Sequence, residues 1–214
     1  MESAKHVDPV FPIVVSSYTP TVNTLLDVEQ FPPGLLIPAT SRETRAVENI
    51  ISLTGIKSLL LEGDAATIVR VQEGMRVHGW IHFACHAIQD QQEPLKSGFH
   101  LHDGRLEVLE IMRRQIPNTD HAFLSACQTS TGTKELSDEA VHLAAGMLAA
   151  GYRGVVATMW SIKNTYAPQI AEGFYSHLLE ENSGKTGLDA DSSARALDYS
   201  VRSIQEKVGV RYRA

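Results

Sequence analysis

Short apolar runs alternate with stretches of helical periodicity along most of this chain of 214 residues. Between the runs, apolar positions recur at spacings of three and four, which is typical of amphipathic helices. Strands joined by crossover helices form a mostly parallel sheet, so the pattern predicts an α/β fold. The expected strands are residues 11–16, 57–63, 80–86, 121–126 and 154–160.

Local signals predict where the helices of the amino-terminal half begin and end. Thr40 and Glu43 have the spacing of a capping box, before a helix that we expect to end at Gly55. Asp64 is expected to cap the next helix. The inward-facing positions of that second helix would be Ile68, Val71 and Met75.

The carboxyl-terminal half begins with a hairpin signal at Asp103 and Gly104, followed by a short helix near 108–114. Ser137 would cap a further helix, and Asn164 would cap the one after it. The inner face of the helix after Ser137 would carry Ala140, Ala144, Met147 and Leu148. A last helix should return to the core through an apolar stripe formed by Ala194, Leu197, Val201, Ile204 and Val208.

We expect a single domain over residues 1–214. Residues 1–37 would supply the amino-terminal strand and a Pro-rich connection. Residues 181–193 are polar and contain glycine, so a mobile loop is expected there, within the domain and before the last helix.

Composition narrows the class of function. Apolar residues make up 43% of the chain and charged residues 21%, as in ordinary globular proteins. The net charge of -6, without clustered Lys or Arg, argues against a nucleic-acid partner. No apolar run approaches the ~20 residues of a membrane span, and no signal core is visible. We therefore expect a cytoplasmic protein with no membrane partner.

The two cysteines, Cys85 and Cys127, form no CxxC pair, which fits neither a disulfide scaffold nor a zinc site of ordinary spacing. Cys85 is expected to pack in the core. His100 and His102 share one face of a strand and could form a metal site with His86, but no carboxylate or thiol of ligand spacing completes it. We therefore expect no metal.

Two of the expected strands end at a reactive residue, His86 in one and Cys127 just after the other. The carboxyl ends of parallel strands meet at one edge of a sheet, where ligand crevices open. An imidazole beside a thiol can remove its proton and later protonate a leaving amine. The backbone N–H groups of Ala87 and Cys127 would then hold an oxyanion. The alternative is that Cys127 is a small buried apolar residue and His86 an ordinary strand-end histidine.

Several segments in order resemble the CHAT domain family of caspase-like and separase-like cysteine peptidases, in particular its fungal-type branch. They are HFACHAIQD, LHDGRLEV, FLSACQTSTG, EAVHLAAGMLAAGYRGVVATMWSI and GFYSHLL, and the resemblance runs from about Pro38 to about Arg211. It implies a caspase-hemoglobinase-like three-layer αβα sandwich and a catalytic dyad of His86 and Cys127 that needs no cofactor.

The same resemblance implies where a substrate would lie. Met159, Trp160 and Ser161, at the end of the fifth expected strand, would pair with an extended protein or peptide substrate as an added strand. Many relatives carry an acidic residue for a basic P1 side chain where this chain has Asn164, and Asp138 is a candidate to replace it. Relatives are commonly switched by attached domains or partners, so a regulatory protein partner is also implied.

The chain also departs from the family in having Ala87 where a glycine is usual, which adds a methyl group beside the expected oxyanion hole. Two functions therefore stay open at this point. One is a cysteine endopeptidase that works through an acyl-enzyme thioester. The other is a catalytically weak or inactive module of the same fold that binds a peptide or a signalling partner.

Overall fold

The structure is a computed structural model that describes residues 12–16, 38–88, 90, 92–125, 137–158, 165–183 and 188–209. For residues 12–16, 38–39 and 137–142 it describes the backbone alone.

Among the described residues, the centre of the molecule is a five-stranded sheet in the order β2-β1-β3-β7-β8, and every neighbouring pair is parallel. All five residues of β3, the middle strand, are buried. The strands are β1 (Pro12–Ser16), β2 (Leu59–Glu62), β3 (Trp80–Ala84), β7 (His121–Leu124) and β8 (Gly154–Ala157). Each lies within a predicted apolar run, so the predicted α/β fold is confirmed.

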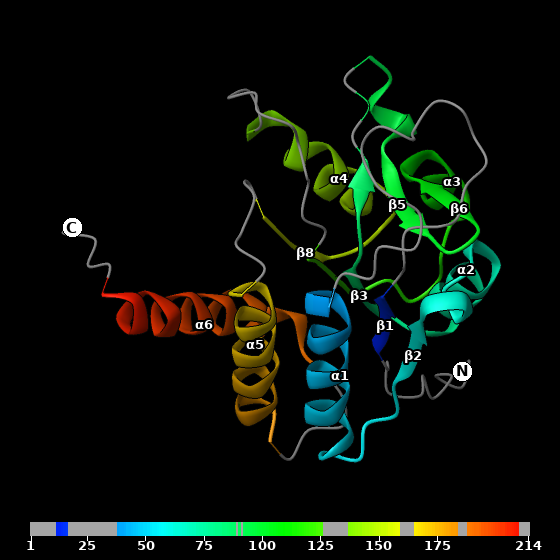
Figure 1. Cartoon of the computed structure of the whole chain (residues 1–214). Coiled ribbons are helices and arrows are strands. Elements are labelled where there is room, and N and C mark those ends of the chain that lie inside the picture. Colours follow the sequence, from blue (N-terminus) through cyan, green and yellow to red (C-terminus); the bar gives the residue numbers. More distant parts are fainter. Residues whose placement is uncertain are drawn as a thin grey trace, which may run out of the picture.

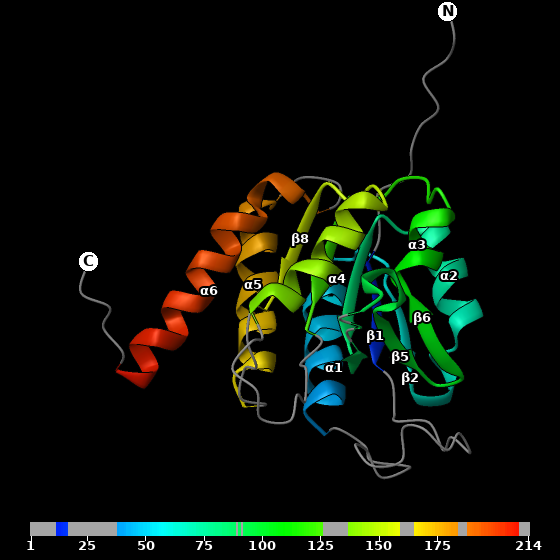
Figure 2. The same ribbon diagram turned by 90° about the horizontal axis from the view of Figure 1, so that it is seen from above.

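Helices cover the two faces of this sheet, which gives three layers (Figures 1 and 2). One face packs against α1 (Pro38–Ser52), α5 (Ala167–Glu181) and α6 (Ser193–Val208), and the other against α2 (Ile68–Val77), α3 (Val108–Arg113) and α4 (Ser137–Ala149). Side chains along β3 alternate between the faces. Ile81 and Phe83 join the core beside α2 and α4, whereas Trp80 joins the core beside α1 and α5.

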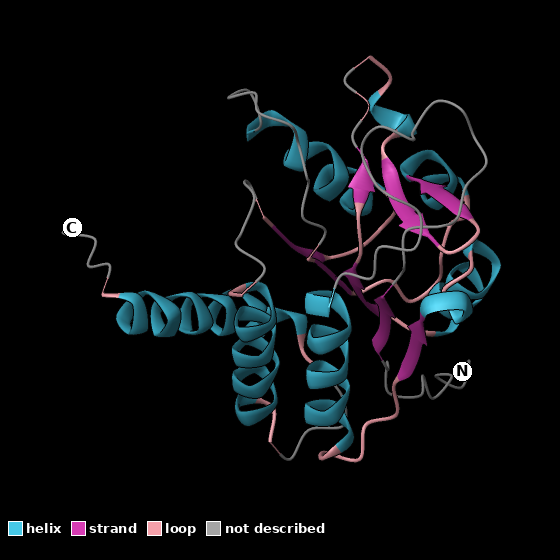
Figure 3. Cartoon of the chain, viewed as in Figure 1, coloured by secondary structure: helices cyan, strands magenta, loops and turns pink. Residues whose placement is uncertain are grey.

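A second, antiparallel sheet lies beside the first and consists of β4 (Ala87–Ile88), β5 (Gly98–Leu101) and β6 (Gly104–Glu107) (Figure 3). The predicted hairpin is β5–β6, with His102 and Asp103 in its turn. Its tip contacts the start of α2, because Asp103 Oδ1 accepts a hydrogen bond from the Ile68 N–H at 2.7 Å. Strand β4, with two residues, was not predicted.

The predicted helix caps at Thr40, Asp64 and Asn164 are wrong, and the cap position of α5 is Tyr166. Helix α1 begins at Pro38, so Thr40 lies inside its first turn, and the Glu43 side chain bonds His82 instead of the helix start. Pro38 fits there because a first-turn N–H has no helical partner to lose. Asp64 lies in a 3-10 turn, and α2 is capped by Thr67, whose side chain accepts from a backbone N–H.

The predicted inner faces of α4 and α6 also need correction. Leu148 is 51% exposed, although Met147 beside it is fully buried. In α6 the buried residues are Ala196 and Ser200, while Ala194 and Val208 are exposed and the other stripe residues are half-buried. The small Ser200 lies against Gly173 of α5, where a Cβ would come within 2.7 Å of its Oγ. Close backbone approach, rather than the apolar stripe, therefore decides which face of α6 packs.

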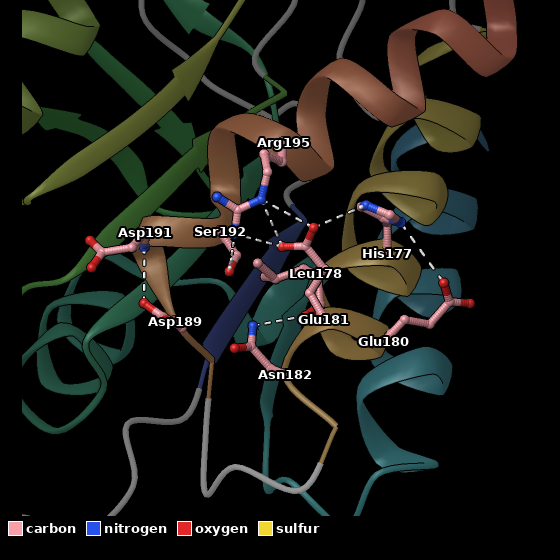
Figure 4. Close-up of polar contacts among 9 residues, drawn as sticks. All are labelled: His177, Leu178, Glu180, Glu181, Asn182, Asp189, Asp191, Ser192 and Arg195. Carbon is pink, nitrogen blue, oxygen red and sulfur yellow. Dashed lines mark hydrogen bonds and ion pairs between the residues drawn. The ribbon is translucent and has the colours of Figure 1, made fainter.

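Exposed ion pairs connect α5 to the start of α6 (Figure 4). The Arg195 guanidinium bonds both carboxylate oxygens of Glu181 at 3.0–3.3 Å, and it also lies 3.2 Å from Ser192 Oγ. Nε2 of His177 is 3.4 Å from the same carboxylate. Residues 190–192, within the segment expected to be a loop, form a 3-10 turn in which Ser192 is buried.

In the described part of the chain, no helix is both long enough and apolar enough to cross a bilayer.

A polar network lies in the core beside α1 and α5. His82 is fully buried, and its Nε2 lies 3.0 Å from Oε1 of Glu43, which is 2% exposed. Its Nδ1 lies 3.3 Å from the hydroxyl of the buried Tyr175. Burial and the charge of Glu43 both raise the pKa of Tyr175, so its hydroxyl stays protonated. The network joins the middle strand to both helices of that layer.

Truncation of Glu43 should destabilise the fold strongly. In Glu43→Ala, His82 loses its buried partner, and we expect the free energy of unfolding to fall by about 3 kcal/mol. The control is Arg45→Ala, which removes the exposed pair of Arg45 with Glu62 and should cost less than about 1 kcal/mol. Urea denaturation measures both. Equal losses in the two variants would contradict a structural role for the Glu43–His82 contact.

A second histidine, His121, is buried without such a partner. It is 1% exposed and stacks on Trp80, with ring centroids 4.4 Å apart, and its Nδ1 has no hydrogen-bond partner among the described residues. Burial lowers its pKa from 6.5 to about 4. Between pH values of about 4 and 6.5, the imidazole of His121 is therefore neutral in the folded protein but protonated in the unfolded chain.

Stability should consequently rise with pH between about 4 and 6.5, because the unfolded state binds the extra proton only in that range. In His121→Phe, which keeps a ring on Trp80, the acid-induced loss of unfolding free energy should shrink by up to about 3 kcal/mol. His102→Gln, at an exposed turn residue, is the control and should keep the wild-type profile. Urea midpoints at several pH values give the comparison, and an unchanged profile in His121→Phe would contradict it.

Candidate active site

The candidate site lies at the edge of the large sheet where β3, β7 and β8 end. These three strands are adjacent and parallel, so their carboxyl ends share one edge. His86 follows the end of β3 by two residues. Ser125 comes directly after β7, and its N–H donates to the Phe83 carbonyl at 2.8 Å, which extends the pairing of the two strands.

The imidazole of His86 is nearly buried, with 7% of the residue exposed. Burial, and after it the charge of His100, lowers the pKa of His86 from 6.5 to about 4. The ring is therefore neutral at pH 7, which is the form that can accept a proton. The lowered pKa makes His86 a weaker base than a solvated histidine, but one that is in its basic form at pH 7.

The chain turns from the large sheet into the small one at His86. Its carbonyl accepts a hydrogen bond from the His100 N–H at 2.8 Å, and Ala87 is the register partner of Phe99. Hydrogen-bonded and non-bonded pairs alternate in antiparallel ladders, so the N–H of Ala87 points away from β5. The Ala87 methyl group packs in the core beside Phe99, on the opposite side of the chain from His86.

Most of the other predicted site residues lie outside the described residues. They are Cys127, Met159, Trp160, Ser161 and Asn164. Asp138 is the second residue of α4, of which the backbone alone is described at that position, and α5 begins after Tyr166. Their roles in a site therefore stay predictions, and His86 and Ala87 are the two predicted site residues whose surroundings are described.

Cys85 packs in the core as predicted. It is 2% exposed and belongs to the cluster of apolar residues beside α2 and α4. Burial, and to a smaller extent the charge of Glu43, raises the pKa of its thiol. The thiolate needed for attack on a substrate is thus disfavoured at this position.

One neighbour of the site, His100, was predicted only as a possible metal ligand together with His86. The β4–β5 pairing places it beside His86. Its half-buried position on β5 contrasts with that of His102, which is exposed in the hairpin turn. The hairpin signal in the sequence places His100 on a strand. Its position opposite His86 follows only from the pairing of that strand with the two-residue strand β4. Among described side chains, no group of three or more His, Cys, Asp or Glu is placed to hold a metal ion.

Parallel strands between two helical layers, with a histidine at the carboxyl edge of the middle strand, define a caspase-like α/β sandwich. Residues 8–207 match the CHAT domain, and the chain belongs to this family, which is part of the caspase-like peptidase superfamily. A comparison with curated proteins found no match.

The buried Cys85 should be inert towards thiol reagents in the folded protein. In a Cys127→Ala variant, where Cys85 is the remaining cysteine, we expect 5,5′-dithiobis(2-nitrobenzoic acid) to react at least about 100-fold more slowly in buffer than in 8 M urea, because reaction requires an opening of the core. Comparable rates in the two solutions would show that this thiol is accessible.

Proposed function

We propose that the chain is a cysteine endopeptidase in which Cys127 attacks the substrate and His86 serves as general base and acid. The observation that carries the proposal is the register of β3 with β7. His121 lies opposite Trp80, and Cys127 and His86 each come six positions later. Both residues thus follow adjacent parallel strands at the same offset, which favours a meeting of their side chains at the carboxyl edge.

The chemistry follows from a neutral imidazole beside a thiol. His86 takes the thiol proton of Cys127, and the sulfur forms a bond to the carbonyl carbon of the peptide. The oxyanion accepts hydrogen bonds from the N–H groups of Ala87 and Cys127. The imidazolium then protonates the amine as the C–N bond breaks, which leaves a thioester. Water, deprotonated by His86, hydrolyses this thioester and restores the thiol.

Two features of the described residues support this assignment. The low pKa of His86 keeps the ring in the form that can accept a proton. The N–H of Ala87 points away from the β4–β5 ladder, while its methyl group packs in the core, so alanine in place of glycine does not fill space on the His86 side. The Ala87 N–H is thus available as a donor and the methyl group does not crowd the site. This favours a catalytic domain over an inactive module.

The substrate is proposed to be a protein or peptide segment in extended conformation. In the described sheet β8 is an edge strand, and an edge can accept a further strand by main-chain hydrogen bonds. Met159, Trp160 and Ser161 follow β8 in the sequence and are assigned to this pairing, with Asn164 and Asp138 near the P1 side chain. A cytoplasmic location would keep the thiol reduced, and a regulatory protein partner would control access to the edge.

Labelling with a thiol-reactive peptide electrophile tests the proposed dyad. The wild-type chain should form an adduct, Cys127→Ala should form none, and His86→Ala should react at least about 100-fold more slowly at pH 7 because the thiol loses its base. His102→Ala, which changes an exposed histidine, should react like the wild type. Mass spectrometry of the intact chain measures the rates.

Equal labelling of the wild type, Cys127→Ala and His86→Ala would overturn the peptidase assignment and favour the peptide-binding module. With labelling confirmed, cleavage-site profiling on a proteome-derived peptide library, with Cys127→Ala as the blank, identifies the P1 preference.

A further inference from the structure

Two histidines lie opposite each other where the small sheet joins the end of β3. The N–H of His100 donates to the carbonyl of His86, and Ala87 and Phe99 form the next register pair. Residues directly opposite in antiparallel strands direct their side chains to the same face, with Cβ atoms about 5 Å apart. Since Ala87 and Phe99 point into the core, both imidazoles lie on the other face of the ladder.

The surroundings of this pair exclude most of the solvent. His86 is 7% exposed, and the Nε2 atoms of both rings are buried. A buried imidazolium is unfavourable, and a second one on the directly opposite residue is more so. The two rings therefore bind protons one after the other, and the titration belongs to the pair.

Among the described residues, the other charged groups near the pair lie on the hairpin and in the segment before it. Arg105 of β6 is the register partner of His100, and its guanidinium lies 3.6 Å from the carboxylate of Glu107. The positive charge of Arg105 also acts on the carboxylate of Asp90. Arg105 and Glu107 are both partly exposed, so their effects on the pair are screened by solvent. Within the β4–β5 ladder, His100 is thus the titratable residue directly opposite His86.

We propose that His100 is a positioning residue for the site: its ring packs against that of His86 and takes up the first proton of the pair, so that His86 stays a neutral base in mildly acidic solution. After burial, the charge of His100 is the second cause of the low pKa of His86, which agrees with this order of protonation. The catalytic part of this inference rests on the proposed function, whereas the coupling of the two rings does not.

The coupling is tested by NMR titration of the imidazole signals in the full chain, with the His86 signal assigned by its loss in His86→Gln. In His100→Gln the titration midpoint of His86 should rise from about 4 by about one unit, and it should stay below 6.5 because burial remains. His102→Gln, two residues away in the exposed turn, should leave the midpoint unchanged. His100→Phe, which keeps a ring without a charge, is the second variant.

An unchanged His86 midpoint in His100→Gln and His100→Phe would overturn the coupling, whatever the activity. The pH profile of thiol labelling tests the positioning role separately. Its acid limb should move to higher pH in His100→Gln by the same shift, with rates at pH 8 within about twofold of the wild type. An equal loss at every pH would overturn that role. A shifted NMR midpoint without labelling in any form would support the coupling and reject the proposed function.

Discussion

The parallel pairing of β3 with β7 is the constraint on which the rest of this structure depends. Every residue of β3 is buried, and its side chains divide between two cores, with Phe83 on one face and Trp80 on the other. A slip of one residue would exchange the two sets and move His82 away from Glu43. The register is therefore fixed by burial on both faces, and this fixes which residues follow the strands at the carboxyl edge.

The same burial sets the chemistry of three histidines in different ways. His82 lies between a carboxylate and a tyrosine hydroxyl, so its ring is satisfied by hydrogen bonds inside the core. His121 is stacked between aromatic rings, and burial lowers its pKa to about 4. His86 has a similarly low pKa, but it stands at the edge of the sheet. The neutral imidazole is a consequence of packing at His121, whereas at His86 it lies at the candidate site.

The large sheet was predictable from the sequence because each strand is a short apolar run that needs no distant information. The helix caps were harder to predict, since the groups that bond the helix starts or the expected capping side chains lie far away in the chain. The N–H of Ile68 is bonded by Asp103, and the Glu43 side chain is bonded by His82, and neither contact has a local signature. Strand β4 was missed because two residues carry no periodicity, and without it the direct pairing of His86 with His100 was not predicted.

The turn after β3 explains how one residue can serve the fold and the site at once. If β3 had continued, His86 would have been one more residue of the parallel ladder. Instead the chain bends at Cys85, and Ala87 and Ile88 pair antiparallel with β5. The carbonyl of His86 is thereby held by β5, while the N–H of Ala87 points out of that ladder. The backbone of the proposed base, and the direction of the proposed donor beside it, both follow from this change of sheet, so a substitution that straightened the turn would alter both together.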